Sequence, residues 1–165
     1  MGVYLCYIIP KDITYTPSVD EVNRIDKLLE KYDISQGHFE HNYYKRIRPI
    51  INPYGVSDVI CPRCSGIISQ DWVYDIIGEI YDNTDSDNEG IDLSDLTKMR
   101  HAPCCHNDIS LIDIDYGNAL RFCTYNAECD ETYYLPPLNN DLLKKINEHS
   151  VEYIGFPAEF FHAKL

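Results

Sequence analysis

The chain of 165 residues is long enough to bury one sizeable core, and its 44% hydrophobic and 25% charged residues are ordinary for a folded globular protein. Its formal net charge of -13 argues against general nucleic-acid binding, because a phosphate backbone repels an acidic surface. We therefore expect a single folded domain over residues 1–165, with a basic protein as its partner.

The start of the chain and its cysteines indicate the compartment. The N-terminal segment lacks the basic region and the small-residue cleavage site of an export signal. No apolar run approaches the roughly 20 residues that a membrane-spanning helix requires. These features predict a cytoplasmic protein without a membrane segment. Seven cysteines are many for that reducing compartment, and an odd number does not suit a disulfide framework, so we expect metal binding.

In the first half of the chain, the apolar pattern predicts strands and helices in alternation. The run at 3–9 predicts a strand buried on both faces. Ser18 and Glu21 have the spacing of a capping box at the start of a helix over 19–32. Residues 35–54 give no clear assignment, and we interpret the basic, aromatic stretch at 43–48 as a helix surface or a source of internal ion pairs. A strand at 54–60, a helix at 69–81 and a solvated acidic loop at 82–90 follow.

The second half returns to strand patterning. Residues 109–114 and 119–125 predict a hairpin, Asn140 can cap a helix that ends at about residue 148, and residues 151–154 predict a final strand. Without residues 61–106, the order is strand, helix, strands, helix, strand. That order predicts an α+β fold of the ferredoxin-like type, a split βαβ antiparallel sheet with helices on one face. The metal-binding segment, at about 61–106, would be a zinc-ribbon-like insertion.

Two short cysteine motifs form the strongest functional signal. CPRC at 61–64 lets one turn direct two thiolates onto one ion, and PCCH at 103–106 supplies the other half. Zn2+ takes four such ligands in a tetrahedron. We expect a structural Zn2+ site made of Cys61, Cys64, Cys104 and Cys105. Neighbouring residues point in different directions in regular structure, so His106 is the alternative fourth ligand. If no metal binds, we interpret these cysteines as small apolar side chains that are buried in the core.

The segment CPRCSG, a helix bearing Trp72 and the segment APCCHNDISLIDIDYGNALRF together resemble a loosely defined group of bacterial proteins of unknown function. Members of that group carry a CPxCG knuckle and a later PCCG, followed by a hairpin that ends in an aromatic strand. The resemblance covers roughly residues 58–125 and implies a zinc-ribbon-like insertion with no known activity. Ser65 and His106 stand where the group tends to have glycine, and the second departure leaves the fourth ligand open.

No catalytic signature accompanies the cysteines, so we expect a non-enzymatic binding protein. Its small size and acidity are those of bacterial immunity proteins, which neutralise toxins, although this likeness is one of bulk properties only. The partner would be a basic toxin or effector domain, steered by negative charge and anchored by an aromatic side chain. The candidate residues are Trp72, Asp82, Asp85, Asp87 and Glu89. The alternatives are a nucleic-acid-associated zinc ribbon and a zinc metalloenzyme, which needs an open coordination position.

Overall fold

The computed structural model describes residues 4–32, 39–55, 58–83, 90–130 and 139–164. The chain divides into two compact units, one of residues 1–44 and 123–165 and the other of residues 45–122. The segment predicted to bind metal, at about 61–106, lies within the second unit, which begins earlier and ends later. None of the described helices is long and apolar enough to cross a membrane.

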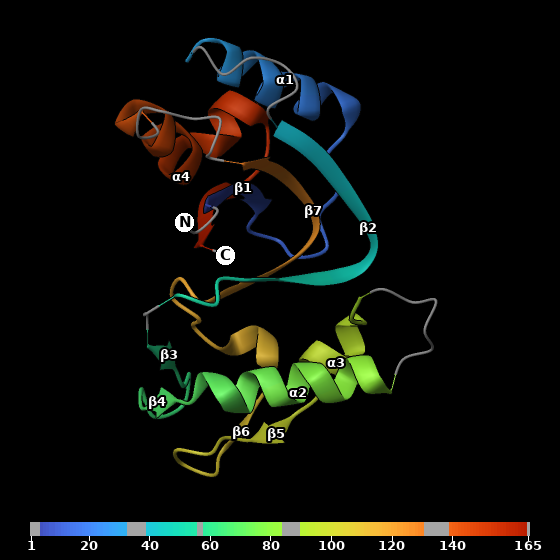
Figure 1. Ribbon diagram of the computed structural model, residues 1–165, viewed down its shortest axis with the longest axis vertical. Helices are drawn as coiled ribbons and strands as arrows, with labels where there is room; N and C mark the ends of the chain where they lie inside the picture. Colours follow the sequence, from blue (N-terminus) through green and yellow to red (C-terminus); the bar gives the residue numbers. More distant parts are fainter. Residues whose placement is uncertain (1–3, 33–38, 56–57, 84–89, 131–138, 165) are drawn as a thin grey trace. The chain divides into compact units, whose positions relative to one another are not determined.

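The first unit is built on a four-stranded antiparallel sheet in the order β2-β7-β1-β8, with two helices (Figure 1). β1 is central and pairs antiparallel with β7 and β8, so that Ile8 lies opposite Ala127 on one side and Phe160 on the other. β2 and β7 continue into the second unit. The elements are β1 (Tyr4–Pro10), α1 (Val19–Glu30), β2 (Phe39–Ile51), β7 (Leu120–Asp130), α4 (Asn140–Ile154) and β8 (Ala158–Lys164).

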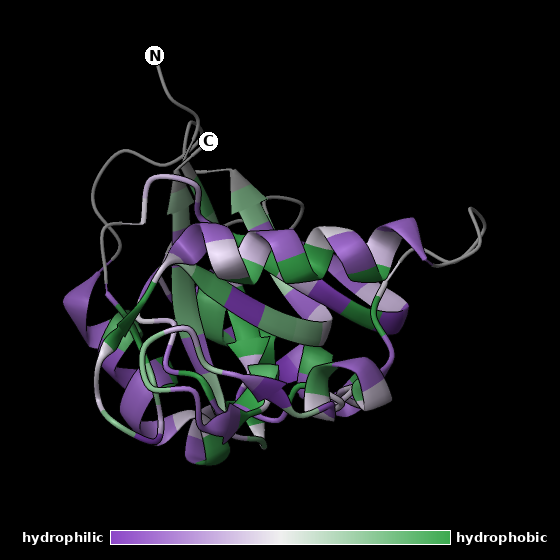
Figure 2. Ribbon diagram, turned by 90° about the horizontal axis from the view of Figure 1, so that it is seen from below, coloured by the Kyte–Doolittle hydropathy of each residue, from purple (hydrophilic) through white to green (hydrophobic). Residues whose placement is uncertain are grey.

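Both helices pack on one face of the sheet, and their buried side chains form one cluster with those of the strands. Cys6 and Ile8 of β1 belong to this cluster, while Tyr7 and Ile9, on the opposite face, are buried as well. The prediction of a strand buried on both faces is therefore confirmed. In Figure 2 the helical ribbons alternate between hydrophilic and hydrophobic residues, as expected for helices with one buried side.

The start of α1 follows from its sequence. The Ser18 hydroxyl accepts a hydrogen bond from the Glu21 amide at 3.4 Å, and the Glu21 carboxylate accepts one from the Ser18 amide at 2.7 Å. This is the predicted capping box. α1 is also tied to the sheet through His41, whose Nε2 lies 3.0 Å from Asp26 Oδ1 and whose Nδ1 lies 2.7 Å from the hydroxyl of buried Tyr125.

The C-terminal elements differ from the prediction. α4 does not end at residue 148 but continues to Ile154 through a kink at His149, so the predicted strand at 151–154 is wrong. Ser150 and Ile154 are buried one turn apart, which continues the buried side of the helix. Gly155, in a left-handed conformation with φ of 98°, ends the helix. The last strand, β8, lies beyond it.

The stretch that gave no assignment is the long strand β2. Residues 43–48 lie within it, so a helix surface is the wrong interpretation. The ion-pair interpretation holds for Arg46, whose Nε lies 3.3 Å from Asp92 Oδ1. Intermediate and exposed residues dominate β2, with Ile47 among its few buried positions, so its sequence lacks a clear apolar alternation.

The second unit combines short helices with two small hairpins. The prediction of a helix at 69–81 is confirmed by α2, whereas the predicted strands at 54–60 and 109–114 shrink to two residues each. After Ile109 the chain forms a 3-10 turn, which a hydrogen bond from the Ser110 hydroxyl to Asp113 Oδ2 closes. Residues 84–89 of the predicted acidic loop lie outside the described residues. The elements are β3 (Val59–Ile60), β4 (Ile67–Ile68), α2 (Gln70–Asp82), α3 (Leu93–Thr97), β5 (Arg100–His101), β6 (Asp108–Ile109) and η1 (Leu111–Asp113).

Candidate metal centre

The two cysteine motifs occupy the turns of the two small hairpins, β3-β4 and β5-β6. In the first turn the Cys61 amide donates to the Gly66 carbonyl at 2.9 Å, and the Ser65 amide donates to the Cys61 carbonyl at 3.0 Å. In the second, the Ala102 amide donates to the carbonyl of Asn107 at 2.9 Å, and the His106 amide donates back to the Ala102 carbonyl at 2.8 Å. The two turns therefore share one hydrogen-bonding pattern.

This shared pattern gives the two turns a position-by-position correspondence. Cys105 in the second turn corresponds to Cys64 in the first, but Ala102 stands where the first turn has Cys61. The missing thiol is supplied by Cys104, two positions further along. The second turn is thus a knuckle with one cysteine displaced, and its tight bend lets two consecutive cysteines face the same point.

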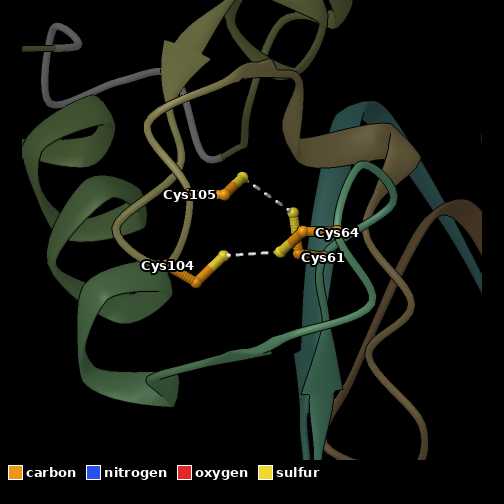
Figure 3. A group of neighbouring side chains, drawn as sticks. All are labelled: Cys61, Cys64, Cys104 and Cys105. Atoms are coloured by element: carbon orange, nitrogen blue, oxygen red, sulfur yellow. Dashed lines mark hydrogen bonds between the residues drawn. The ribbon is translucent and has the colours of Figure 1, made fainter.

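The four thiols of this cluster converge (Figure 3). Their sulfur atoms all lie within 4.8 Å of one another, with Cys64 Sγ 3.5 Å from Cys104 Sγ and Cys61 Sγ 3.8 Å from Cys105 Sγ. Four sulfurs bound tetrahedrally to a metal at about 2.3 Å lie about 3.8 Å apart. These cysteines could hold a metal ion. His106, the alternative ligand, is exposed and lies outside this group.

The backbone of each turn is bent into an unusual conformation just after its last cysteine. Ser65 has φ of 58° and His106 has φ of 60°. This is the left-handed backbone conformation, which residues other than glycine adopt only at a cost in free energy. Gly66 leaves room beside the cluster, because a Cβ there would lie 3.1 Å from Cys64 Sγ, a tight contact. Its amide instead donates to that sulfur at 3.3 Å.

Without a metal, the thiols ionise unequally. Burial disfavours the Cys61 thiolate, but the backbone amides of Arg63 and Cys64 and the neighbouring thiols stabilise it and lower the pKa of Cys61 to about 7. Burial and the neighbouring thiols raise the pKa of Cys104 to about 12. The Gly66 amide and the Cys104 thiol favour the Cys64 thiolate, yet burial and the thiols of Cys105 and Cys61 leave the pKa of Cys64 raised. Metal binding must therefore displace protons, because only thiolates act as ligands.

Contacts outside the cluster join the two hairpins and strengthen the second one. Arg63 Nε donates to the Asp108 carbonyl at 3.2 Å, which joins the first turn to the second hairpin. His101 Nδ1 lies 2.9 Å from Asp108 Oδ1, which joins β5 to β6. Because each of the four strands has only two residues, these contacts supplement a very small hydrogen-bonded ladder.

The candidate partner-binding residues are only partly described. Trp72 is half-buried on α2, and Asp82 is exposed at the last position of that helix. Asp85, Asp87 and Glu89 lie outside the described residues.

The structure adds three exposed acids on α2 that were not singled out, Asp71, Asp75 and Glu79. Their four-residue spacing, on the side away from Val73 and Ile77, was the sequence signal that could have identified them.

Comparison with known protein families, with curated proteins and with solved structures finds no match. The interpretation of the site therefore depends on its own geometry.

Proposed function

We propose that the chain is a non-catalytic, cytoplasmic binding protein that holds a structural zinc ion in its cysteine cluster and neutralises a basic protein partner, such as a toxin or effector domain. This proposal rests mainly on the acidic face of α2. The metal centre would stabilise the unit that contains this helix.

Zinc in a structural role suits the donor set. Four sulfur atoms satisfy the tetrahedral preference of Zn2+ and leave no position for water or substrate, which a catalytic zinc needs. Iron also accepts four thiolates, so the identity of the metal must be measured. Since the adjoining strands are so short, a bound ion would contribute much of the free energy that holds the two hairpins in place.

We infer finer fold types for both units. In the first, the strand order β2-β7-β1-β8 and the chain order β1-α1-β2 and β7-α4-β8 support a ferredoxin-like, split βαβ topology. In the second, the paired cysteine turns support a zinc-ribbon-like arrangement.

The acidic face of α2 consists of four exposed side chains in successive turns: Asp71, Asp75, Glu79 and Asp82. Among the described residues none of them forms an ion pair, and the helix contains no basic residue. Like charges four residues apart destabilise a helix by about 0.2–0.5 kcal/mol per pair, and acids near the helix C-terminus oppose its dipole. A face that costs its own helix stability supports a role in binding a positively charged surface.

Trp72 adjoins this acidic face. It precedes Asp75 by three positions, so the two side chains are neighbours on the helix surface, and it is half-buried. Tryptophan is among the residues enriched in binding hot spots. The acids would speed encounter with the partner, and Trp72 would supply apolar contact area.

The test begins with a partner isolated by pull-down, followed by charge reversal with the double variant Asp71→Lys/Asp75→Lys. Because these acids would steer a basic partner, we expect the association rate constant at low salt to fall by roughly tenfold or more and to lose most of its salt dependence. Stopped-flow measurements over a range of salt concentrations give both quantities.

The matched control is Glu148→Lys/Glu152→Lys on α4, an exposed acidic pair with the same spacing and the same change in net charge. A smaller effect in this control assigns the steering to α2. Equal effects from the two variants, or none from either, would contradict an acidic binding face on α2.

A further inference from the structure

A cavity of about 300 Å³ opens in the second unit between α2, α3 and the start of β5. Its volume is at the lower end of the range of about 300–1,000 Å³ that is typical of sites for small molecules. Its described lining residues are Ile76, Glu79, Ile80, Asn83, Asp95, Lys98 and Arg100. The cavity is not part of the cysteine cluster, although β5 leads from Arg100 directly into the turn that bears Cys104.

The charges in this cavity are balanced but not paired with one another. Two carboxylates, Glu79 and Asp95, and two cations, Lys98 and Arg100, line the same space. Among the residues that the structure describes, none of the four takes part in an ion pair. Oppositely charged side chains in one small cavity usually neutralise each other, so the lack of pairing leaves two carboxylates and two cations available to a ligand.

Arg100 is fixed in place by the backbone. Its Nη1 donates to the Asp95 carbonyl and to the Lys98 carbonyl, each at 2.9 Å. These bonds hold the guanidinium at the cavity wall without using Nε or Nη2. A guanidinium held in this way is suited to donate hydrogen bonds to a carboxylate, and Lys98 adds a second positive charge to the same cavity.

We propose that this cavity binds a free α-amino acid with an apolar side chain. Its carboxylate would contact Arg100 and Lys98, its ammonium group would contact Glu79 and Asp95, and its side chain would lie against Ile76 and Ile80. A simple anion would be repelled by the two acids, and a simple cation by the two bases. Only a ligand with both charges satisfies both pairs of charged side chains, and its binding can be measured with the protein partner absent.

Isothermal titration of the metal-loaded protein with three related probes tests the proposal. Leucine carries both charges, N-acetylleucine lacks the ammonium group, and leucinamide lacks the carboxylate. We expect leucine to bind saturably at one site and each blocked form to bind at least about tenfold more weakly. No saturable binding of leucine, isoleucine, valine or phenylalanine would overturn the proposal, as would equal binding of a blocked form.

Variants then locate the site. Lys98→Met and Glu79→Gln each remove one exposed charge from the cavity wall and should weaken leucine binding at least about tenfold. Glu152→Gln, an exposed position on α4 outside the lining, should leave the affinity unchanged. Thermal unfolding of each variant confirms that it is folded. If the affinity for leucine is the same in Lys98→Met and Glu79→Gln as in the parent protein, the amino acid binds elsewhere and the proposal is wrong.

Discussion

Ser65 and His106 occupy the same place in their two turns, immediately after a cysteine, and both have positive φ. The left-handed conformation costs a residue with a side chain about 1–2 kcal/mol, whereas glycine adopts it freely. The turn geometry is evidently required, because it brings the preceding cysteine sulfur to the cluster. These two residues thus retain strain that a glycine would remove.

We predict that Ser65→Gly raises the free energy of unfolding of the zinc-loaded protein by about 0.5–1 kcal/mol, after allowing for the larger entropy of glycine in the unfolded chain. Denaturant unfolding measures the change. Ser69→Gly is the control, because Ser69 has φ of -61° and makes no side-chain capping bond. A gain in the control equal to that in Ser65→Gly, or no gain in Ser65→Gly, would show that the strain is absent.

At the scale of elements, the second cysteine turn differs from the first by the position of one thiol. Ala102, which is fully buried, stands where Cys61 stands in the first turn, and Cys104 supplies the sulfur instead. If the two turns are equivalent, a cysteine at position 102 should reach the cluster as well.

We therefore predict that Cys104→Ala weakens zinc binding by at least about tenfold and that the double variant Ala102→Cys/Cys104→Ala recovers most of the loss. Competition with a chromophoric chelator measures both affinities. Thr97→Cys/Cys104→Ala, which keeps the number of cysteines but places the thiol on α3, outside both turns, is the control. A double variant that binds zinc no better than Cys104→Ala would mean that the two turns are not equivalent.

The elements that the sequence predicted are those whose signals are local. α1 has a capping box and α2 has apolar residues on one side, so both were correctly assigned. β2 was missed because few of its side chains are buried, and α4 was ended too early because a polar residue, Ser150, occupies the next buried position after Ile146.

The cysteine motifs were recognisable because their spacing is local, yet the correspondence of Ala102 with Cys61 depends on backbone hydrogen bonds that no spacing reveals. The cavity at Arg100 was not predicted, since its lining comes from three elements separated in sequence.

For the molecule as a whole, the two units differ in how they are stabilised. The first has a four-stranded sheet with two helices and a contiguous apolar cluster. In the second, the cysteine turns are supported by two separate hairpins with two-residue strands. Such short hairpins are marginal by themselves. A metal ion held by the four cysteines would cross-link them, and this is the central claim.

Native mass spectrometry with elemental analysis of the purified protein tests this claim most directly. We predict one zinc ion per chain in the parent protein, loss of the ion in Cys61→Ser/Cys105→Ser, and full retention in the control Cys123→Ser, which changes a buried thiol outside the cluster. The double variant should also unfold at a lower denaturant concentration. A folded, metal-free parent protein, or full zinc occupancy in the double variant, would contradict the account.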